Sequence, residues 1–167
     1  MNISIRKAKT NELATALSLF EAAAMKLRAK GINQWQHWIA PAPDYVQWVK
    51  TGFDNKEYFF IEKANQLAGM FRLMYNDEEY WGKQTDSAAY LHSLVTKTEF
   101  EGQQIGATVL ATMTVYLRQK GVKYFRLDCK ADNEALCNYY IRQGFVPVRL
   151  QVMPHYTVQL FEKQLNE

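Results

Sequence analysis

A glycine-flanked loop in the middle of the chain restricts the fold more than any other feature. Residues 99–110 read EFEGQQIGATVL, with Gly102 and Gly106 four positions apart and an apolar run beyond them. The apolar segment before the loop, from Ala88 to Val95, predicts a strand. The segment after it, from Gly106 to Lys120, has helical spacing and ends at a further glycine, as helices commonly do. A strand, a loop and a helix in this order indicate an α/β arrangement.

The rest of the sequence predicts short strands and helices around this loop. Strands are expected at Ile3–Ala8, Tyr58–Glu62, Leu67–Tyr75, Tyr124–Cys129, Val146–Val152 and Thr157–Lys163. Helices are expected after the caps Thr10 and Asp44, ending at Gly31 and Gly52, and from Asn133 to Gln143. No internal repeat or linker interrupts the sequence, and 167 residues suit one domain. A single mixed α/β domain spanning residues 1–167 is therefore expected.

Composition excludes several classes of protein. The net charge is only +3, with basic residues scattered among acidic ones, whereas nucleic-acid binders usually carry a concentrated basic stripe. No stretch reaches the ~18 apolar residues of a membrane span, and no apolar run follows the basic N-terminal residues. Neither Cys129 nor Cys137 belongs to a Cys-x-x-Cys pair. We expect a cytoplasmic protein without nucleic-acid or membrane partners; its oligomeric state is open, with a homodimer among the alternatives.

The glycine loop has two interpretations. A strand-to-helix turn presents unpaired N–H groups and the positive end of the helix dipole, which together favour an anion. Glycine lets the backbone approach a phosphate closely, because no Cβ intervenes. The full P-loop and dinucleotide patterns are absent, so two glycines alone fit a phosphate loop and a plain helix start equally well.

A second signal lies in ADNEALCNYYIRQGFVPV, residues 131–148. Asn133 follows a strand at its C-terminal end, where open α/β sheets bind ligands. Tyr140 comes seven residues later, about two helical turns, and so lies near the same face of the helix. Alternatively, Tyr139 and Tyr140 are half-buried core aromatics.

These two segments together resemble a known family. LVTKTEFEGQQIGATVL, followed by the pattern Asn-x-x-Leu-x-x-Tyr-Tyr-x-x-x-Gly-Phe, is similar to the GCN5-related N-acetyltransferases (GNAT), most strongly from about Tyr90 to Val148. The family loop reads Arg/Gln-x-x-Gly-x-Gly/Ala. Glu101 and Gln104 depart from it, and Glu101 would bring a negative charge near a phosphate unless its side chain points away.

The resemblance implies a fold and a co-substrate. The fold is a mostly antiparallel sheet of about seven strands, flanked by about four helices and splayed between the fourth and fifth strands. The co-substrate is acetyl-CoA, with its pyrophosphate on the loop and its pantetheine arm along the fourth strand. No metal is expected. The implied coenzyme-binding residues are Leu94, Val95, Gly102, Gln103, Gln104, Ile105, Gly106, Ala107, Thr108 and Asn133.

The reaction that the resemblance implies is direct transfer of an acetyl group to an amine. Tyr140 matches the family tyrosine that protonates the departing thiolate. A base must deprotonate the amine, and the residue that does so is open. His92 is suited by its ordinary pKa of ~6.5, but a histidine on a sheet surface has the same pattern. Asp128 could relay a proton or merely cap a loop, and Glu62 is a third candidate.

Aromatic residues are the candidates for binding the acceptor. Trp35 and Trp38 lie in an irregular segment after the first helix, and Trp81 in a polar insertion before the fourth strand. Aromatic faces attract a cationic amine, although large core residues give the same pattern. The acceptor is expected to be a small-molecule amine or a protein amine. The alternative function is a non-catalytic CoA-binding or regulatory module of the same fold.

Overall fold

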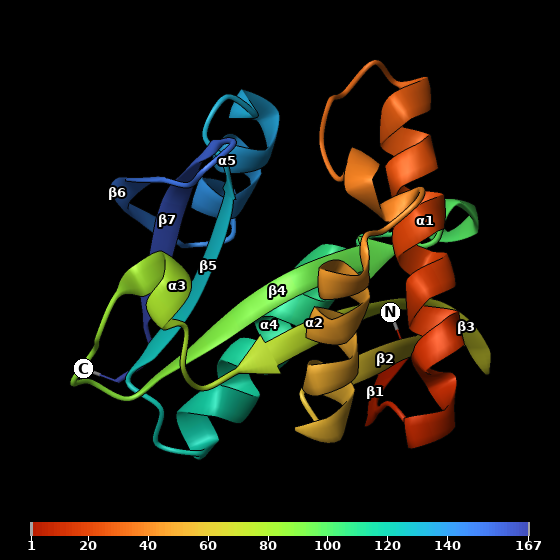
Figure 1. The fold of residues 1–167 in the computed structure, drawn as a ribbon. Coiled ribbons are helices and arrows are strands. Elements are labelled where there is room, and N and C mark those ends of the chain that lie inside the picture. Colours follow the sequence, from red (N-terminus) through yellow and green to blue (C-terminus); the bar gives the residue numbers. More distant parts are fainter. Residues whose placement is uncertain (1, 167) are drawn as a thin grey trace. The chain divides into compact units, whose positions relative to one another are not determined.

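The computed structural model describes residues 2–166. The chain divides into two compact units. The first comprises the chain up to Arg72 together with Ser93–Gly106, and the second comprises Leu73–His92 together with the chain from Ala107 onwards. Strand β4 (Ala88–Thr96) and helix α4 (Ile105–Gln119) each contribute to both units (Figure 1).

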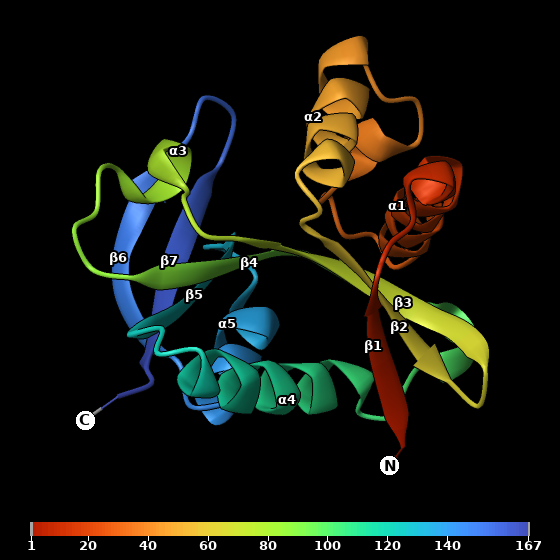
Figure 2. The ribbon, with the colours of Figure 1, turned by 90° about the horizontal axis from the view of Figure 1, so that it is seen from below.

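The first unit is built on antiparallel strands. β1 (Ile3–Lys7) pairs with β2 (Tyr58–Lys63), and β2 pairs with β3 (Gln66–Met74). Helices α1 (Leu13–Ala29) and α2 (Pro43–Asp54) lie on one side of these strands (Figure 2). The helices bury an apolar face against the strands, and in this core Phe20 stacks on Trp38 with ring centroids 4.1 Å apart.

The second half of β4 lies close against β3. The amide of Lys97 donates to the carbonyl of Ala68 at 2.8 Å. A Cβ added to Gly69 would lie 2.1 Å from the carbonyl oxygen of Val95, so only glycine permits this approach. Ser93 has a φ of 58° in the middle of β4, an uncommon conformation for a non-glycine residue.

The second unit contains the other strands. The first half of β4 pairs in parallel with β5 (Tyr124–Lys130), β5 pairs antiparallel with β7 (Thr157–Gln164), and β7 pairs antiparallel with β6 (Val146–Val152). The short helix α3 (Glu78–Trp81) lies on the opposite side of these strands from α4 and α5 (Glu134–Arg142), as Figure 2 shows. Trp81, Tyr90 and Leu160 are buried together in its core.

The expected fold class is confirmed. The order of hydrogen-bonded strands is β1-β2-β3-β4-β5-β7-β6, with β4 and β5 as the parallel pair. The pairs of β4 with β5 run only from Ala88–Tyr124 to Leu91–Leu127, although both strands continue further, which is the expected splay. Whether the chain is a single domain stays a prediction.

Some element boundaries differ from those expected. The described residues contain five α-helices rather than about four, because the polar insertion forms α3. Thr10 does not cap α1 but begins a 3₁₀ turn, Thr10–Glu12, that precedes it. α2 begins after Ala42 and continues through Gly52, whose missing side chain leaves room for Tyr58 and Arg72. Among the described residues, no helix has both the length and the apolar character needed to cross a membrane.

Candidate active site

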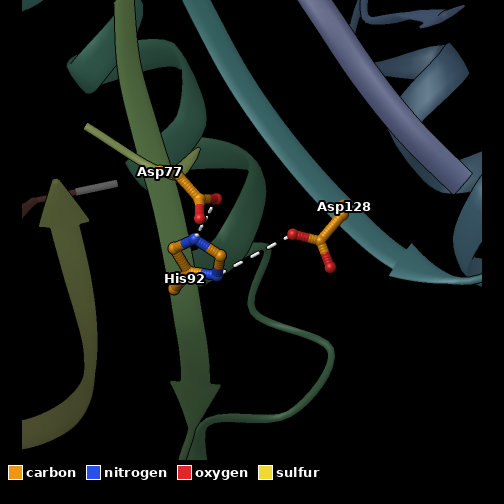
Figure 3. A group of neighbouring side chains, drawn as sticks. All are labelled: Asp77, His92 and Asp128. Atoms are coloured by element: carbon orange, nitrogen blue, oxygen red, sulfur yellow. Dashed lines mark hydrogen bonds and ion pairs between the residues drawn. The ribbon is translucent and has the colours of Figure 1, made fainter. Parts of the chain in front are cut away.

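His92 lies between two aspartates in the second unit. It is the first residue of β4 beyond the pairs with β5, and Asp128 is the corresponding residue of β5. Its Nε2 lies 2.9 Å from Oδ2 of Asp77, and its Nδ1 lies 3.8 Å from Oδ2 of Asp128. Figure 3 shows the imidazole between the two carboxylates, which approach different ring nitrogens. Two of the three residues that the sequence offered as alternative bases are therefore brought together, whereas Glu62 lies in the first unit and pairs with Arg6.

Asp128 has an unusual affinity for a proton. The pKa of its carboxyl group is raised from 3.8 to about 6, mainly by burial, with His92 lowering it and the neighbouring Asp77 raising it by smaller amounts. A carboxylate whose pKa lies near neutrality is a stronger base than an ordinary aspartate, yet it is still mostly ionised at pH 7. The pair can therefore accept a proton from an incoming group.

Asp77 was not among the predicted site residues. Its side chain is only 5% exposed, and it lies just before α3, in the polar insertion NDEEYWGKQTD. The insertion is rich in acidic residues, and nothing in the sequence separates Asp77 from Glu78 and Glu79. Its contact with His92 depends on how the insertion folds back onto β4.

The same three residues are a candidate group for a metal ion. One ligand atom from each lies within 4.8 Å of the others. However, the aspartates lie on different nitrogens of the imidazole, so an ion bound to Nε2 would have to displace the hydrogen bond to Asp77. The arrangement therefore suits proton transfer better than metal binding. The absence of a metal stays a prediction.

Tyr140 is almost fully buried on α5. Its side chain is 7% exposed, and its ring lies against Phe145 and Phe161, with centroids 6.2 and 5.8 Å away. Burial, the largest cause, raises the pKa of its hydroxyl well above the ordinary value. The phenol therefore keeps its proton at neutral pH and can act as a hydrogen-bond donor, but it is a weaker acid than an exposed tyrosine.

Asn133 caps the helix that carries Tyr140. Its Oδ1 accepts a hydrogen bond from the amide of Leu136 at 3.1 Å. One acceptor position of the oxygen is thus used within the chain, and the side-chain amide nitrogen is a donor that suits a carbonyl oxygen of a coenzyme. Nearby, Cys129 is buried, with its sulfur 3.5 Å from that of Cys137, and both are free thiols.

The glycine loop belongs to the first unit up to Gly106. Gly102 has a φ of 71° and Gln104 a φ of 54°, so both lie in the left-handed region. Gln104 thus holds the conformation that the family glycine would hold. The amide of Gln103 donates to the carbonyl of Phe100 at 3.3 Å. α4 then begins at Ile105, and the first four N–H groups of a helix have no partner within it.

Glu101 points toward α1. Its carboxylate forms ion pairs with Lys26 and with Lys30, the latter at 3.3 Å, and these bonds lower its pKa. Lys63 of β2 donates to the side chain of Gln103. The negative charge of Glu101 is therefore countered by two lysines, and with Lys63 the surroundings of the loop are cationic. This set of donors and charges fits a phosphate group.

The residues expected along the pantetheine arm differ in exposure. Leu94 is partly buried, whereas Val95 is buried in the core of the first unit. A groove of about 370 Å³ runs between α1 and the end of β4, and its lining includes Ser18, Val95 and Thr98. The start of the loop is thus accessible from the side of α1.

The tryptophans lie mainly in the protein core. Trp38 is 5% exposed and Trp81 4% exposed, each within an apolar cluster, and the ring of Trp81 also faces the guanidinium of Arg126 at 4.6 Å. Trp35 is half-buried, with its ring centroid 5.9 Å from that of Phe20. This favours the packing alternative for Trp38 and Trp81, and acceptor binding by any of the three stays a prediction.

Comparisons with known proteins identify the class to which this fold and these residues belong. The sequence model of the acetyltransferase (GNAT) family matches residues 28–145. The chain belongs to the GNAT family and is accordingly an acyltransferase. It is 28% identical over 145 residues to the uncharacterized N-acetyltransferase YesJ of Bacillus subtilis, covering 84% of this chain and 78% of that protein.

Solved structures share the fold. A GNAT-family acetyltransferase from Listeria monocytogenes superposes with a TM-score of 0.78 at 23% identity, covering 98% of this chain and 95% of that one. The structure of yncA from Salmonella typhimurium, solved with its cofactor acetyl-CoA, has a TM-score of 0.67 at 15% identity and covers 100% and 96% of the two chains.

Proposed function

We propose that the protein transfers the acetyl group of acetyl-CoA to a primary amine, and that His92 and Asp128 accept the proton of the amine. The observation that carries this proposal is the His92–Asp128 pair, in which a carboxyl group with a pKa of about 6 faces a ring nitrogen 3.8 Å away. Two such acceptors side by side suit a group that arrives with several N–H bonds, as an ammonium does.

The glycine loop and its lysines support acetyl-CoA as the donor. The N–H groups at the start of α4 attract an anion, and Lys26, Lys30 and Lys63 add positive charge around the loop. The fold neighbour yncA was solved with acetyl-CoA. In this proposal residues Gly102 to Thr108 contact the pyrophosphate, Leu94 and Val95 lie beside the pantetheine arm, and Asn133 donates to it.

The reaction needs a base because amines are protonated at neutral pH. An amine with a pKa of ~10.4 is only about 0.04% neutral at pH 7, and only the neutral form attacks a thioester. The His92–Asp128 pair removes one proton from the ammonium, and the neutral nitrogen then bonds to the acetyl carbon. As the bond from carbon to sulfur breaks, the hydroxyl of Tyr140 gives its proton to the departing thiolate, and the second proton that the nitrogen loses restores the hydroxyl through solvent.

A thiol-release assay over a panel of primary amines tests the function. Tyr140→Phe is expected to lower kcat by about 10²–10⁴-fold and to leave CoA affinity nearly unchanged, because a positioned proton donor contributes about that much. Tyr139→Phe is the matched control, since Tyr139 is the half-buried neighbour on α5. Equal single-turnover rates for wild type and Tyr140→Phe would remove the hydroxyl from the mechanism.

The alternative, a CoA-binding module without catalysis, was suggested by the unusual residues of the loop. The ion pairs of Glu101 weaken that argument, because its charge is directed to lysines. Calorimetry with CoA separates the two functions. CoA binding without thiol release for any amine would favour the module, whereas amine-dependent release would favour the enzyme.

A further inference from the structure

We infer that Asp77 is a positioning residue, which holds the proton of His92 on Nε2 and so presents the unprotonated Nδ1 toward Asp128. The inference rests on the proposed function and adds a residue that the family motifs do not include. The geometry that supports it lies within the second unit (Figure 3).

The two contacts of the imidazole are unequal. Nε2 lies 2.9 Å from the Asp77 carboxylate, a hydrogen-bond distance, whereas Nδ1 lies 3.8 Å from Asp128. An ionised carboxylate only accepts hydrogen bonds, so the short contact requires a hydrogen on Nε2. In a neutral imidazole the other nitrogen then carries a lone pair. The short bond thus selects the tautomer in which Nδ1 can accept a proton.

Asp77 is held firmly in this position. It directly precedes α3, and that helix is anchored by Trp81, which is buried against Tyr90. The hydroxyl of Tyr80 in the same helix lies 2.6 Å from that of Tyr156. These contacts anchor α3 at Trp81 and Tyr80, and the 2.9 Å bond holds the carboxylate of Asp77 beside the ring of His92.

The charge of Asp77 acts directly on Nε2, at 2.9 Å. The ionisable groups that contact the imidazole include Asp77 at Nε2, Asp128 at Nδ1, and Tyr80, whose ring centroid lies 5.6 Å from that of the imidazole. When Nδ1 takes up a proton, the ring becomes cationic, and Asp77 then stabilises it as an ion pair. The carboxylate therefore sets the tautomer before proton uptake and favours the charged ring afterwards.

The test is Asp77→Asn in the full chain, which keeps the size of the side chain but removes its charge. An asparagine can donate its amide hydrogens to Nε2, and this favours the opposite tautomer. ¹⁵N NMR of His92 should show hydrogen on Nε2 and none on Nδ1 in wild type, and a shift toward the other tautomer in the variant. Asp86→Asn is the matched control, because Asp86 is an exposed aspartate before β4 that pairs with Lys123.

Kinetics provide the second readout. Asp77→Asn should lower kcat by 10-fold or more, up to the ~10²–10⁴-fold that a positioned base contributes, with little change in KM for acetyl-CoA. The pH profile of kcat/KM should also differ from that of wild type, because the nitrogen of His92 that faces Asp128 no longer carries the lone pair. A merely structural role would lower stability without altering the pH profile.

The outcomes separate the inference from the proposed function. A hydrogen on Nδ1 of wild-type His92, or an Asp77→Asn variant with unchanged tautomer and unchanged kcat, would overturn the inference while leaving the enzyme intact. Absence of amine-dependent thiol release by wild type would instead overturn the proposed function. The NMR comparison then decides by itself whether Asp77 sets the tautomer of His92.

Discussion

At the scale of single residues, Asp128 combines a chemical use with a cost in stability. Its carboxyl group is buried beside a second aspartate, and its pKa is about 6 in the folded chain against an ordinary value of 3.8. The folded state thus binds the proton more tightly than the unfolded state. The protonated carboxyl group costs the folded state nothing below about pH 4. Ionisation lowers the free energy of unfolding as the pH rises through about 6.

We therefore predict that Asp128→Asn stabilises the protein at pH 8 while reducing acetyl transfer. Each pH unit is worth about 1.4 kcal/mol, so the gain in free energy of unfolding is at most about 3 kcal/mol and vanishes near pH 4. Thermal melts across pH 4–8 measure it. Asp132→Asn is the control, because Asp132 is an exposed aspartate paired with Lys130, and it should show no such dependence on pH. A variant less stable than wild type at pH 8 would contradict the prediction.

At the scale of elements, the connection between the glycine loop and α1 explains how the chain accommodates an acidic residue in the loop. Glu101 is held by Lys26 and Lys30, which are near the C-terminal end of α1. Cations are favoured at that end of a helix by the dipole. The two lysines therefore interact favourably with the dipole of α1 and at the same time neutralise the charge of Glu101.

Replacing Glu101 should reveal this arrangement. We predict that Glu101→Gln binds CoA about 2–5-fold more tightly at low salt, because the exposed ion pairs of Glu101 are weak and their loss makes the lysines available to phosphate. The gain should shrink at high salt. Calorimetry at two salt concentrations measures both. Glu99→Gln, which removes the partner of Lys97, is the control, and equal or weaker binding by Glu101→Gln would count against the lysines as phosphate partners.

The sequence predicts elements well where the pattern is long and poorly where it is short. The helix after the glycine loop and the strands around it were located to within one or two residues. α3 was missed because four residues are too few for helical periodicity. Gly52 was predicted to end α2, but the helix continues past it. A glycine stands there because any larger side chain would clash with Tyr58 and Arg72.

At the scale of the whole molecule, coenzyme binding should be visible as added stability. A ligand at 100 times its Kd stabilises the folded state by ~2.7 kcal/mol. For a chain of this size we predict that CoA raises Tm by about 5–10 °C. Pantetheine, which lacks the phosphates, should raise it much less at the same concentration. An unchanged Tm with CoA, measured by scanning fluorimetry or calorimetry, would contradict binding at the glycine loop.

The sequence alone determined the order of the strands and helices other than α3, because this order depends on local patterns of apolar residues and glycines, and its two motifs carried the resemblance to the family. It also offered His92 and Asp128 as candidates, without linking them. Only the tertiary structure decided that Asp77 and Asp128 flank one imidazole and that Glu101 turns to Lys26 and Lys30. Such contacts join residues 15 to 75 positions apart, and the register of strands and the packing of helices, rather than any local pattern, bring them together.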